Sequence, residues 1–209
     1  MRKAIVSLGV GPQARLLALA SRSFRPYAER HGYELALSPE IVDPSRPAPW
    51  SKIALLRKLA SEYDLLLWLD ADLVIVDHSV DIADELEDGR DLYLVEHKTK
   101  EGRMPNSGVM LLRGGEPTLA FLDEVYSQTD LINHRWWENA AICRLLGYNL
   151  DPVGPGDPTP LLSDRTKLIS TRWNAIRDSP VRDPRIRHYP GYSLKVRAAL
   201  MTRDLVLRR

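Results

Sequence analysis

The residues best able to do chemistry in this chain are two aspartates, Asp70 and Asp72, which directly follow an apolar run at 65–69. A run of this length is typical of a buried strand, and α/β proteins bind ligands where such strands end. Two carboxylates this close repel each other unless a cation lies between them. Because a divalent metal ion that carries a phosphorylated ligand supplies that cation, we interpret Asp-Ala-Asp as a metal site.

We expect different roles for the two acids. Asp72 would coordinate the metal ion directly, and Asp70 would hold a ribose hydroxyl or a metal-bound water; Mg²⁺ or Mn²⁺ suits such oxygen ligands. His188 is the best candidate for a third ligand, since it follows a predicted strand and precedes the turn Pro190-Gly191. The competing interpretation is two surface acids in a turn and a partly buried, hydrogen-bonded histidine.

A second polar group opens the apolar strand predicted at 107–113. Asn106 and Ser107 carry side chains that can hydrogen-bond sugar hydroxyls, and Gly108 lets a ligand approach the backbone. The alternative is an ordinary turn before a core strand.

A third group begins a predicted helix with the sequence Trp136-Trp137-Glu138-Asn139. Aromatic faces pack against the apolar faces of sugars, while a carboxylate binds hydroxyls or acts as a base. Near a helix amino terminus, Glu138 is stabilised as the anion. The alternative is that the tryptophans belong to the core and Glu138 only caps the helix.

Three cations are candidates for contact with phosphate. Lys52 precedes the second predicted helix and could meet a phosphate, although a solvated lysine is the alternative. Arg172 and Lys195 lie in the carboxyl-terminal segment, where either could neutralise charge that develops on a leaving diphosphate.

The charge distribution supports an anionic ligand near the carboxyl terminus. Residues 164–209 hold 12 Lys/Arg and 4 Asp/Glu, a net charge of +8, whereas residues 1–163 hold 17 and 24, a net charge of −7. The total of +1 predicts no polyanion partner by itself, but the basic segment could contact an anionic membrane or polyanion peripherally.

Length and composition indicate one sizeable α/β domain, with 209 residues, 44% hydrophobic and 27% charged. The single cysteine, Cys143, excludes an intrachain disulfide. We find neither a signal peptide nor a membrane-spanning segment, so we expect a cytoplasmic protein.

Hydrophobic periodicity predicts alternating strands and helices, and hence a mainly parallel sheet in a three-layer arrangement. A polar, mobile segment is expected at 97–105, a short acidic helix at 79–88, and an ordered turn or flap in the proline-rich segment at 151–160. The predicted strands are 3–8, 33–37, 65–69, 91–95, 107–113, 166–169 and 185–188, and the predicted helices are 14–30, 52–62, 116–127, 137–146 and 194–206.

Taken together, these segments resemble the GT-A glycosyltransferases, in particular the galactosyl-, mannosyl- and xylosyltransferase family that includes yeast Golgi mannan enzymes and plant xyloglucan xylosyltransferases. They occur in the family's order over most of the chain. The sequences that carry the resemblance are WSK at 50–52, YDLLLWLDAD at 63–72, NSGVMLLR at 106–113, WWEN at 136–139, RWN at 172–174 and HYPG at 188–191.

The resemblance implies a Rossmann-like GT-A fold, a UDP- or GDP-sugar donor and Mn²⁺ or Mg²⁺. It implies one catalytic domain over 1–209, with a nucleotide-binding half at about 1–105 and an acceptor half that completes the metal site at about 106–209. It implies retention of anomeric configuration. By position, it places Asp70, Asp72 and His188 at the metal, Asn106, Ser107 and Gly108 along the donor sugar, and Glu138 and Asn139 at the reaction centre. The family has Gln where this chain has Asn139.

The leading hypothesis is therefore transfer of a hexose or pentose from a nucleotide-diphosphate sugar to a hydroxyl acceptor. One alternative, a sugar-phosphate nucleotidyltransferase, needs a glycine-rich, basic loop after the first strand, and here the only cation of that loop is Arg15. The other alternative is a non-catalytic module that binds nucleotide sugars or carbohydrate. The combination of two aspartates, His188 and Glu138 argues against it.

Overall fold

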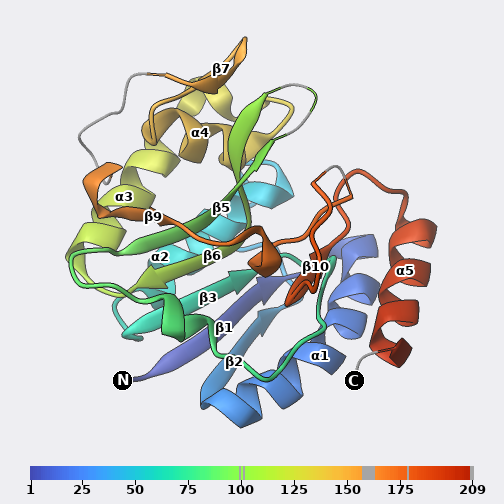
Figure 1. The fold of residues 1–209 in the computed structure, drawn as a ribbon. Coiled ribbons are helices and arrows are strands. Elements are labelled where there is room, and N and C mark those ends of the chain that lie inside the picture. The colour runs from blue at the N-terminus through green and yellow to red at the C-terminus, as the bar shows by residue number, and fades with distance from the viewer. Residues whose placement is uncertain (99, 101, 157–162, 178, 208–209) are drawn as a thin grey trace.

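A computed structural model describes residues 1–98, 100, 102–156, 163–177 and 179–207. Its centre is a six-stranded sheet of order β2-β1-β3-β6-β5-β9 (Figure 1). Five strands run in one direction and β6 runs in the other, which confirms a mainly parallel sheet. The strands are β1 (Lys3–Leu8), β2 (Tyr33–Ser38), β3 (Leu65–Leu69), β5 (Leu92–Lys98), β6 (Arg103–Arg113) and β9 (Thr166–Leu168).

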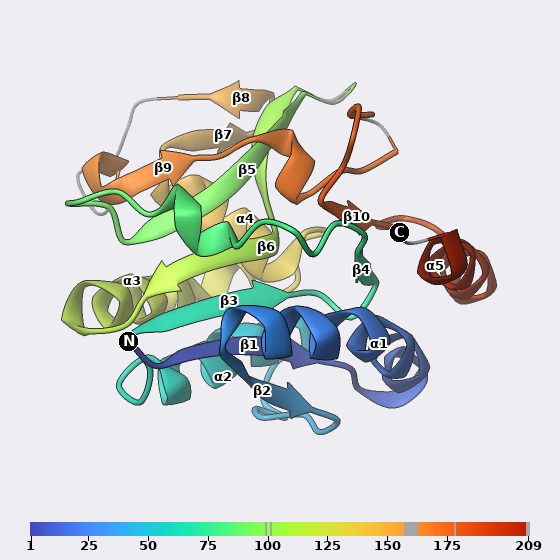
Figure 2. The same ribbon diagram turned by 60° about the horizontal axis from the view of Figure 1, so that its bottom comes forward.

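Helices cover both faces of this sheet, so the predicted three-layer α/β architecture is also confirmed (Figures 1 and 2). On one face lies α1, with α5 packed beside it; the other face is covered by α2, α3 and α4. Strand β3 buries alternate residues in the two layers, which explains its unbroken apolar sequence. The helices are α1 (Ala14–His31), α2 (Ser51–Leu59), α3 (Glu116–Ser127), α4 (Trp137–Leu145) and α5 (Leu194–Leu207).

Two short antiparallel pairs lie outside the main sheet. In the first, β4 (Leu73–Ile75) pairs with β10 (Ile186–His188), and the register sets His188 opposite Leu73. Because β4 follows Asp72 directly, this pairing brings His188 beside the two aspartates. The second pair consists of β7 (Tyr148–Leu150) and β8 (Val153–Pro155).

Six 3₁₀ turns connect the described elements. The acidic segment expected to form a helix at 79–88 is one such turn, over four residues only. The turns are Gly11–Gln13, Ala48–Trp50, Ile82–Glu85, Thr129–Leu131, Ser163–Arg165 and Thr171–Trp173.

The expectation of a polar, mobile segment at 97–105 was wrong. Strand β5 continues to Lys98, β6 begins at Arg103, and His97 pairs with Met104. His97 is only 1% exposed, because its side of the hairpin faces inward. The polar composition of this segment concealed the strand pairing.

Strand β6 changes partners where the site begins. Leu94 of β5 pairs with Met110, but the next residue, Val95, pairs with Asn106, so 107–109 are unpaired with β5. The same residues stay attached to the neighbouring strand, since Asp70 N donates to Gly108 O at 2.9 Å. This irregularity sets 106–108 at the end of β3, beside Asp70.

The remaining expectations concern segments and boundaries. Of the proline-rich segment at 151–160, residues 157–160 lie outside the described residues, and the rest includes β8. The proposed division of the domain near residue 105 stays a prediction, and β6 runs across that point. Among the described residues, no helix is long and apolar enough to cross a membrane.

Candidate active site

Asp70 follows the end of β3 and divides its two oxygens between different partners. Oδ1 accepts a hydrogen bond from Trp68 Nε1 at 2.7 Å and forms an ion pair with Lys52 Nζ at 3.1 Å. Oδ2 faces His188 Nε2 at 3.9 Å. The side chain is 29% exposed, so Asp70 is the part of this group that solvent and ligands reach most readily.

Asp72 divides its oxygens in the same way but is buried. Oδ1 lies 3.4 Å from His188 Nε2, and Oδ2 pairs with Arg197 Nη1 at 3.1 Å. Burial works against ionisation of Asp72, but His188 and Arg197 outweigh it and lower the pKa of Asp72 below its ordinary value. Asp72 is therefore an anion at neutral pH.

The structure brings together the three residues that the sequence singled out for a metal. One ligand atom from each of Asp70, Asp72 and His188 lies within 4.8 Å of the others. Two carboxylate oxygens and one imidazole nitrogen fit a small divalent cation such as Mg²⁺ or Mn²⁺. A cation between them would also relieve the repulsion of two neighbouring acids.

Lys52 of α2 is buried on the side of Asp70 that faces away from His188, where its ammonium contacts several side chains. Its ammonium contacts Glu138 Oε1 at 2.8 Å and Asp70 Oδ1 at 3.1 Å, and donates to Ser107 Oγ at 3.1 Å. Burial alone would lower the pKa of Lys52, but the two carboxylates raise it to about 12. The sequence suggested a phosphate contact for Lys52, whereas the structure sets its charge among protein acids.

Glu138 lies in the first turn of α4, buried against Lys52. Its Oε1 contacts Lys52 Nζ, while Oε2 is buried and has no hydrogen-bond partner among the described residues. Burial raises the pKa of Glu138, and Lys52 offsets only part of that effect. The preceding residue, Trp137, has a φ of 43°, which is unusual for a bulky side chain and is the kind of strain found at functional sites.

The remaining residues predicted for the donor sugar and reaction centre are tied to one another. Asn139 Oδ1 accepts from Ser107 N at 2.7 Å, and Asn139 Nδ2 donates to Pro105 O at 3.3 Å. A Cβ at Gly108 would lie 2.3 Å from His188 Cε1, so the glycine makes room for the imidazole. The sequence had suggested instead that Gly108 makes room for a ligand.

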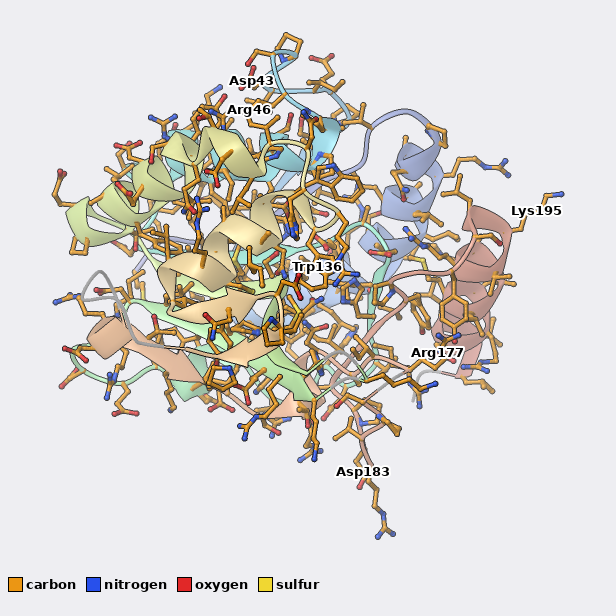
Figure 3. The ribbon with its side chains drawn as sticks, turned by 90° about the horizontal axis from the view of Figure 1, so that it is seen from above. Asp43, Arg46, Trp136, Arg177, Asp183 and Lys195 are labelled. Atoms are coloured by element: carbon orange, nitrogen blue, oxygen red, sulfur yellow. The ribbon has the colours of Figure 1, made fainter. Side chains whose placement is uncertain are left out.

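The two cations predicted in the carboxyl-terminal segment have different surroundings. Lys195 is exposed and extends outward from α5 (Figure 3), and Arg172 Nε donates to Asp183 O at 2.7 Å. Arg197, two residues beyond Lys195, contacts Asp72 instead. Helical spacing could have revealed it, because Arg197 shares the inward side of α5 with the buried Met201.

The fold of this chain is the GT-A fold of glycosyltransferases of known structure. The structure is similar to a glycosyltransferase involved in glycosylation of the major capsid of PBCV-1, with TM-score 0.76, 15% identity and coverage of 97% of this chain and 100% of that one. It is also similar to the galactosyltransferase LgtC, with TM-score 0.58, 13% identity and coverage of 96% and 95%. A third similar structure is the glycosyltransferase GlyE of Streptococcus pneumoniae TIGR4, with TM-score 0.59, 15% identity and coverage of 99% and 63%.

Part of the sequence also matches the model of a glycosyltransferase family. Residues 13–101 match the model of the galactosyl transferase GMA12/MNN10 family. No curated protein sequence matches the chain. The family match includes Asp70 and Asp72, and together with the fold it supports a glycosyltransferase, as the resemblance implied.

Proposed function

We propose that this protein is a metal-dependent glycosyltransferase that moves a hexose or pentose from a UDP- or GDP-sugar to a hydroxyl acceptor. The observation that carries the proposal is the convergence of Asp70 Oδ2, Asp72 Oδ1 and His188 Nε2 at the end of β3. In an open α/β sheet, the carboxyl ends of the parallel strands form the usual ligand-binding edge.

The three converging atoms would hold Mn²⁺ or Mg²⁺. When bound, the ion supplies positive charge to the diphosphate of the donor and favours its departure. Arg197 adds a second cation on this side, with Lys195 further out on the same helix. Both are proposed contacts of the donor diphosphate.

The donor sugar would lie along 106–108, where β6 leaves β5. Asn106 is the proposed polar contact, and Ser107 is fixed in place by Lys52 and Asn139. Lys52 would hold Asp70 and Glu138 in position, which places it behind the donor.

Glu138 is the proposed reaction-centre acid. Its unpartnered Oε2 is costly to bury, so a ligand hydroxyl or a developing positive charge on the sugar would supply the missing partner. Asn139 would act beside it by positioning the backbone of Ser107. We propose retention of configuration, in keeping with the family that the chain resembles.

The acceptor would approach past the two tryptophans that precede Glu138. Trp137 is 42% exposed, and Trp136 lies near the middle of the face seen in Figure 3. Exposed aromatic faces of this kind pack well against sugar rings. The basic carboxyl-terminal segment is a proposed peripheral contact with an anionic membrane or polyanion, in a cytoplasmic protein.

A donor-hydrolysis assay tests the proposal without knowledge of the acceptor. The protein is incubated with UDP- and GDP-sugars in Mn²⁺ or in EDTA, and release of free sugar and nucleoside diphosphate is followed. We expect slow hydrolysis of at least one donor that requires the metal ion. Release of pyrophosphate from a nucleoside triphosphate and a sugar phosphate, with no donor hydrolysis, would identify a nucleotidyltransferase instead.

A further inference from the structure

A chain of hydrogen bonds leads from the backbone of β6 to the ring of His188 and decides which ring nitrogen carries the proton. His188 Nε2 faces Asp70 and Asp72, while Nδ1 lies 2.9 Å from Asn174 Oδ1. Only an unprotonated Nε2 has a lone pair for a metal ion. The atom that faces Nδ1 therefore determines which of the two ring nitrogens carries the proton.

The orientation of both asparagine amides follows from backbone groups that have one role only. Gly108 N can only donate, and it does so to Asn106 Oδ1 at 2.9 Å. The side chain of Asn174 approaches that same Oδ1 at 2.9 Å and the carbonyl oxygen of Asn106 at 3.4 Å. Both of these atoms are acceptors, so the group of Asn174 that faces them is its NH₂.

The carbonyl oxygen of Asn174 consequently points at His188, and Nδ1 must carry a hydrogen to bond with it. Asn174 is 0% exposed and His188 is 4% exposed, so water cannot easily replace this contact. Leaving such a buried polar group unpaired is unfavourable, because it has lost its hydrogen bonds to water. Without Asn174, the two carboxylates would favour a proton on Nε2, which is the form that cannot bind a metal ion.

We propose that Asn106 and Asn174 are positioning residues that hold His188 with its proton on Nδ1 and its Nε2 lone pair directed at the space between Asp70 and Asp72. The metal-binding consequence rests on the proposed function. The position of the proton rests only on the hydrogen bonds described here. The same two asparagines connect the proposed donor-sugar strand with the metal site.

Binding of Mn²⁺ alone, followed by electron paramagnetic resonance of the free ion, tests the consequence. Asn174→Leu removes the acceptor for Nδ1, and Asn149→Leu, at an exposed asparagine of β7 outside the site, is the matched control. Loss of a partner that orients a metal ligand typically weakens metal binding about 10–100-fold, so we expect that loss for Asn174→Leu and binding close to wild type for Asn149→Leu. Equal binding by Asn174→Leu and wild type, with both folded by circular dichroism, would overturn the proposal.

Nitrogen-15 spectra of metal-free protein at alkaline pH test the proton position directly, because protonated and bare ring nitrogens differ in chemical shift. The chain has five histidines, and His188→Gln identifies the signal of His188. Wild type and Asn149→Leu should carry the proton on Nδ1, and Asn174→Leu should carry it on Nε2. A wild-type proton on Nε2, or no change in Asn174→Leu, contradicts the proposal. A wild-type Nδ1 proton without Mn²⁺ binding supports the hydrogen-bond assignment and overturns the metal site of the proposed function.

Discussion

The site has two sides, one formed by α2 and α4 and the other by β10 and α5, and their acidic side chains have different partners. On the α2–α4 side, Lys52 lies between Asp70 and Glu138, and the two carboxylates raise its pKa. On the β10–α5 side, Asp72 has Arg197 on one oxygen, but its other oxygen and Asp70 Oδ2 both face His188 Nε2. The cation between the acids is a lysine on the first side, and on the second side it would be the proposed metal ion.

Asp70 belongs to both sides, and this explains why the site needs the buried lysine. With Oδ1 fixed by Lys52 and Trp68, only Oδ2 remains for the metal side. Removing one partner of a buried ion pair is costly, so the α2–α4 side is expected to act chiefly as a scaffold. The β10–α5 side is expected to bind. Substitutions on the two sides should therefore fail in different assays.

The largest effect is expected for Asp72→Asn on the binding side. Loss of a metal-ligating charge removes several kcal/mol of stabilisation from the leaving group, which corresponds to a fall in donor turnover of about a thousandfold or more. The amide keeps the size of the side chain, so the fold should survive. Donor turnover in Mn²⁺ is measured together with thermal unfolding, and normal turnover would remove Asp72 from the metal site.

The next effect is expected for Lys52→Met on the scaffold side. It leaves the buried Glu138 and its neighbour Asp70 without the lysine, which should lower the free energy of unfolding by about 3–5 kcal/mol. Urea denaturation measures this loss. Adding Glu138→Gln to Lys52→Met should restore part of the stability, because the unpaired carboxylate of Glu138 is then replaced by a neutral amide. If Lys52→Met is as stable as wild type, the α2–α4 side does not act as the scaffold of the site.

The sequence revealed the binding side better than the scaffold side, for a physical reason. Asp70 and Asp72 end a conspicuous apolar strand, and His188 stands before a turn, so local pattern was enough to bring them together in the prediction. The contact between Lys52 and Glu138 joins residues 52 and 138 through two helices on one face of the sheet, and no local pattern encodes it.

For the fold too, elements with a strong local sequence pattern were predicted best. Strand β1 and helix α3 have the predicted bounds because their hydrophobic periodicity and flanking breakers are strong. The strands at 91–95 and 107–113 were predicted, but the extension of β5 to Lys98 and the start of β6 at Arg103 were missed because this part of the hairpin is polar. Asn174 was quoted only as part of RWN, since an asparagine shows its hydrogen-bond partners only in the folded chain.

A buried histidine near the binding side gives a prediction of intermediate size. Burial lowers the pKa of His97 to about 4, and neither ring nitrogen has a hydrogen-bond partner in the described part of the chain. The unfolded chain binds a proton below about pH 6.5 and the native chain does not, so stability falls as the pH drops from about 6.5 to 4.

The measurement for His97 is urea unfolding across this pH range. At about 1.4 kcal/mol per pKa unit, His97 should account for a loss of about 3 kcal/mol by pH 4. His97→Phe carries no titrating group, so its stability should fall less than that of wild type by that amount. Identical pH dependence in both proteins would show that His97 takes up a proton in the native state.

The smallest effects are expected for two cations of α5, Arg197, which contacts Asp72, and Lys195, which is exposed. Arg197→Gln removes the partner of Asp72 and a proposed diphosphate contact, and should raise the KM for the donor about tenfold, equivalent to roughly 1.4 kcal/mol. Lys195→Gln is the comparison variant: Lys195 is exposed and lies further out on α5, and an exposed charge contributes about 0–1 kcal/mol, so its rise in KM should be smaller. A larger effect for Lys195 than for Arg197 would assign the diphosphate to the sequence-predicted residue.

The central claim is that this site binds a nucleoside diphosphate through a metal ion, and a thermal-shift screen tests it most directly. UDP, GDP and their sugars are each added with Mn²⁺ or with EDTA. A ligand present at about one hundred times its Kd stabilises the native state by about 2.7 kcal/mol, which for a chain of this size raises Tm by roughly 5–10 °C. We predict such a rise for at least one nucleotide with Mn²⁺ and its loss in EDTA and in Asp72→Asn. An equal rise in EDTA, or no rise with any nucleotide, would contradict the account.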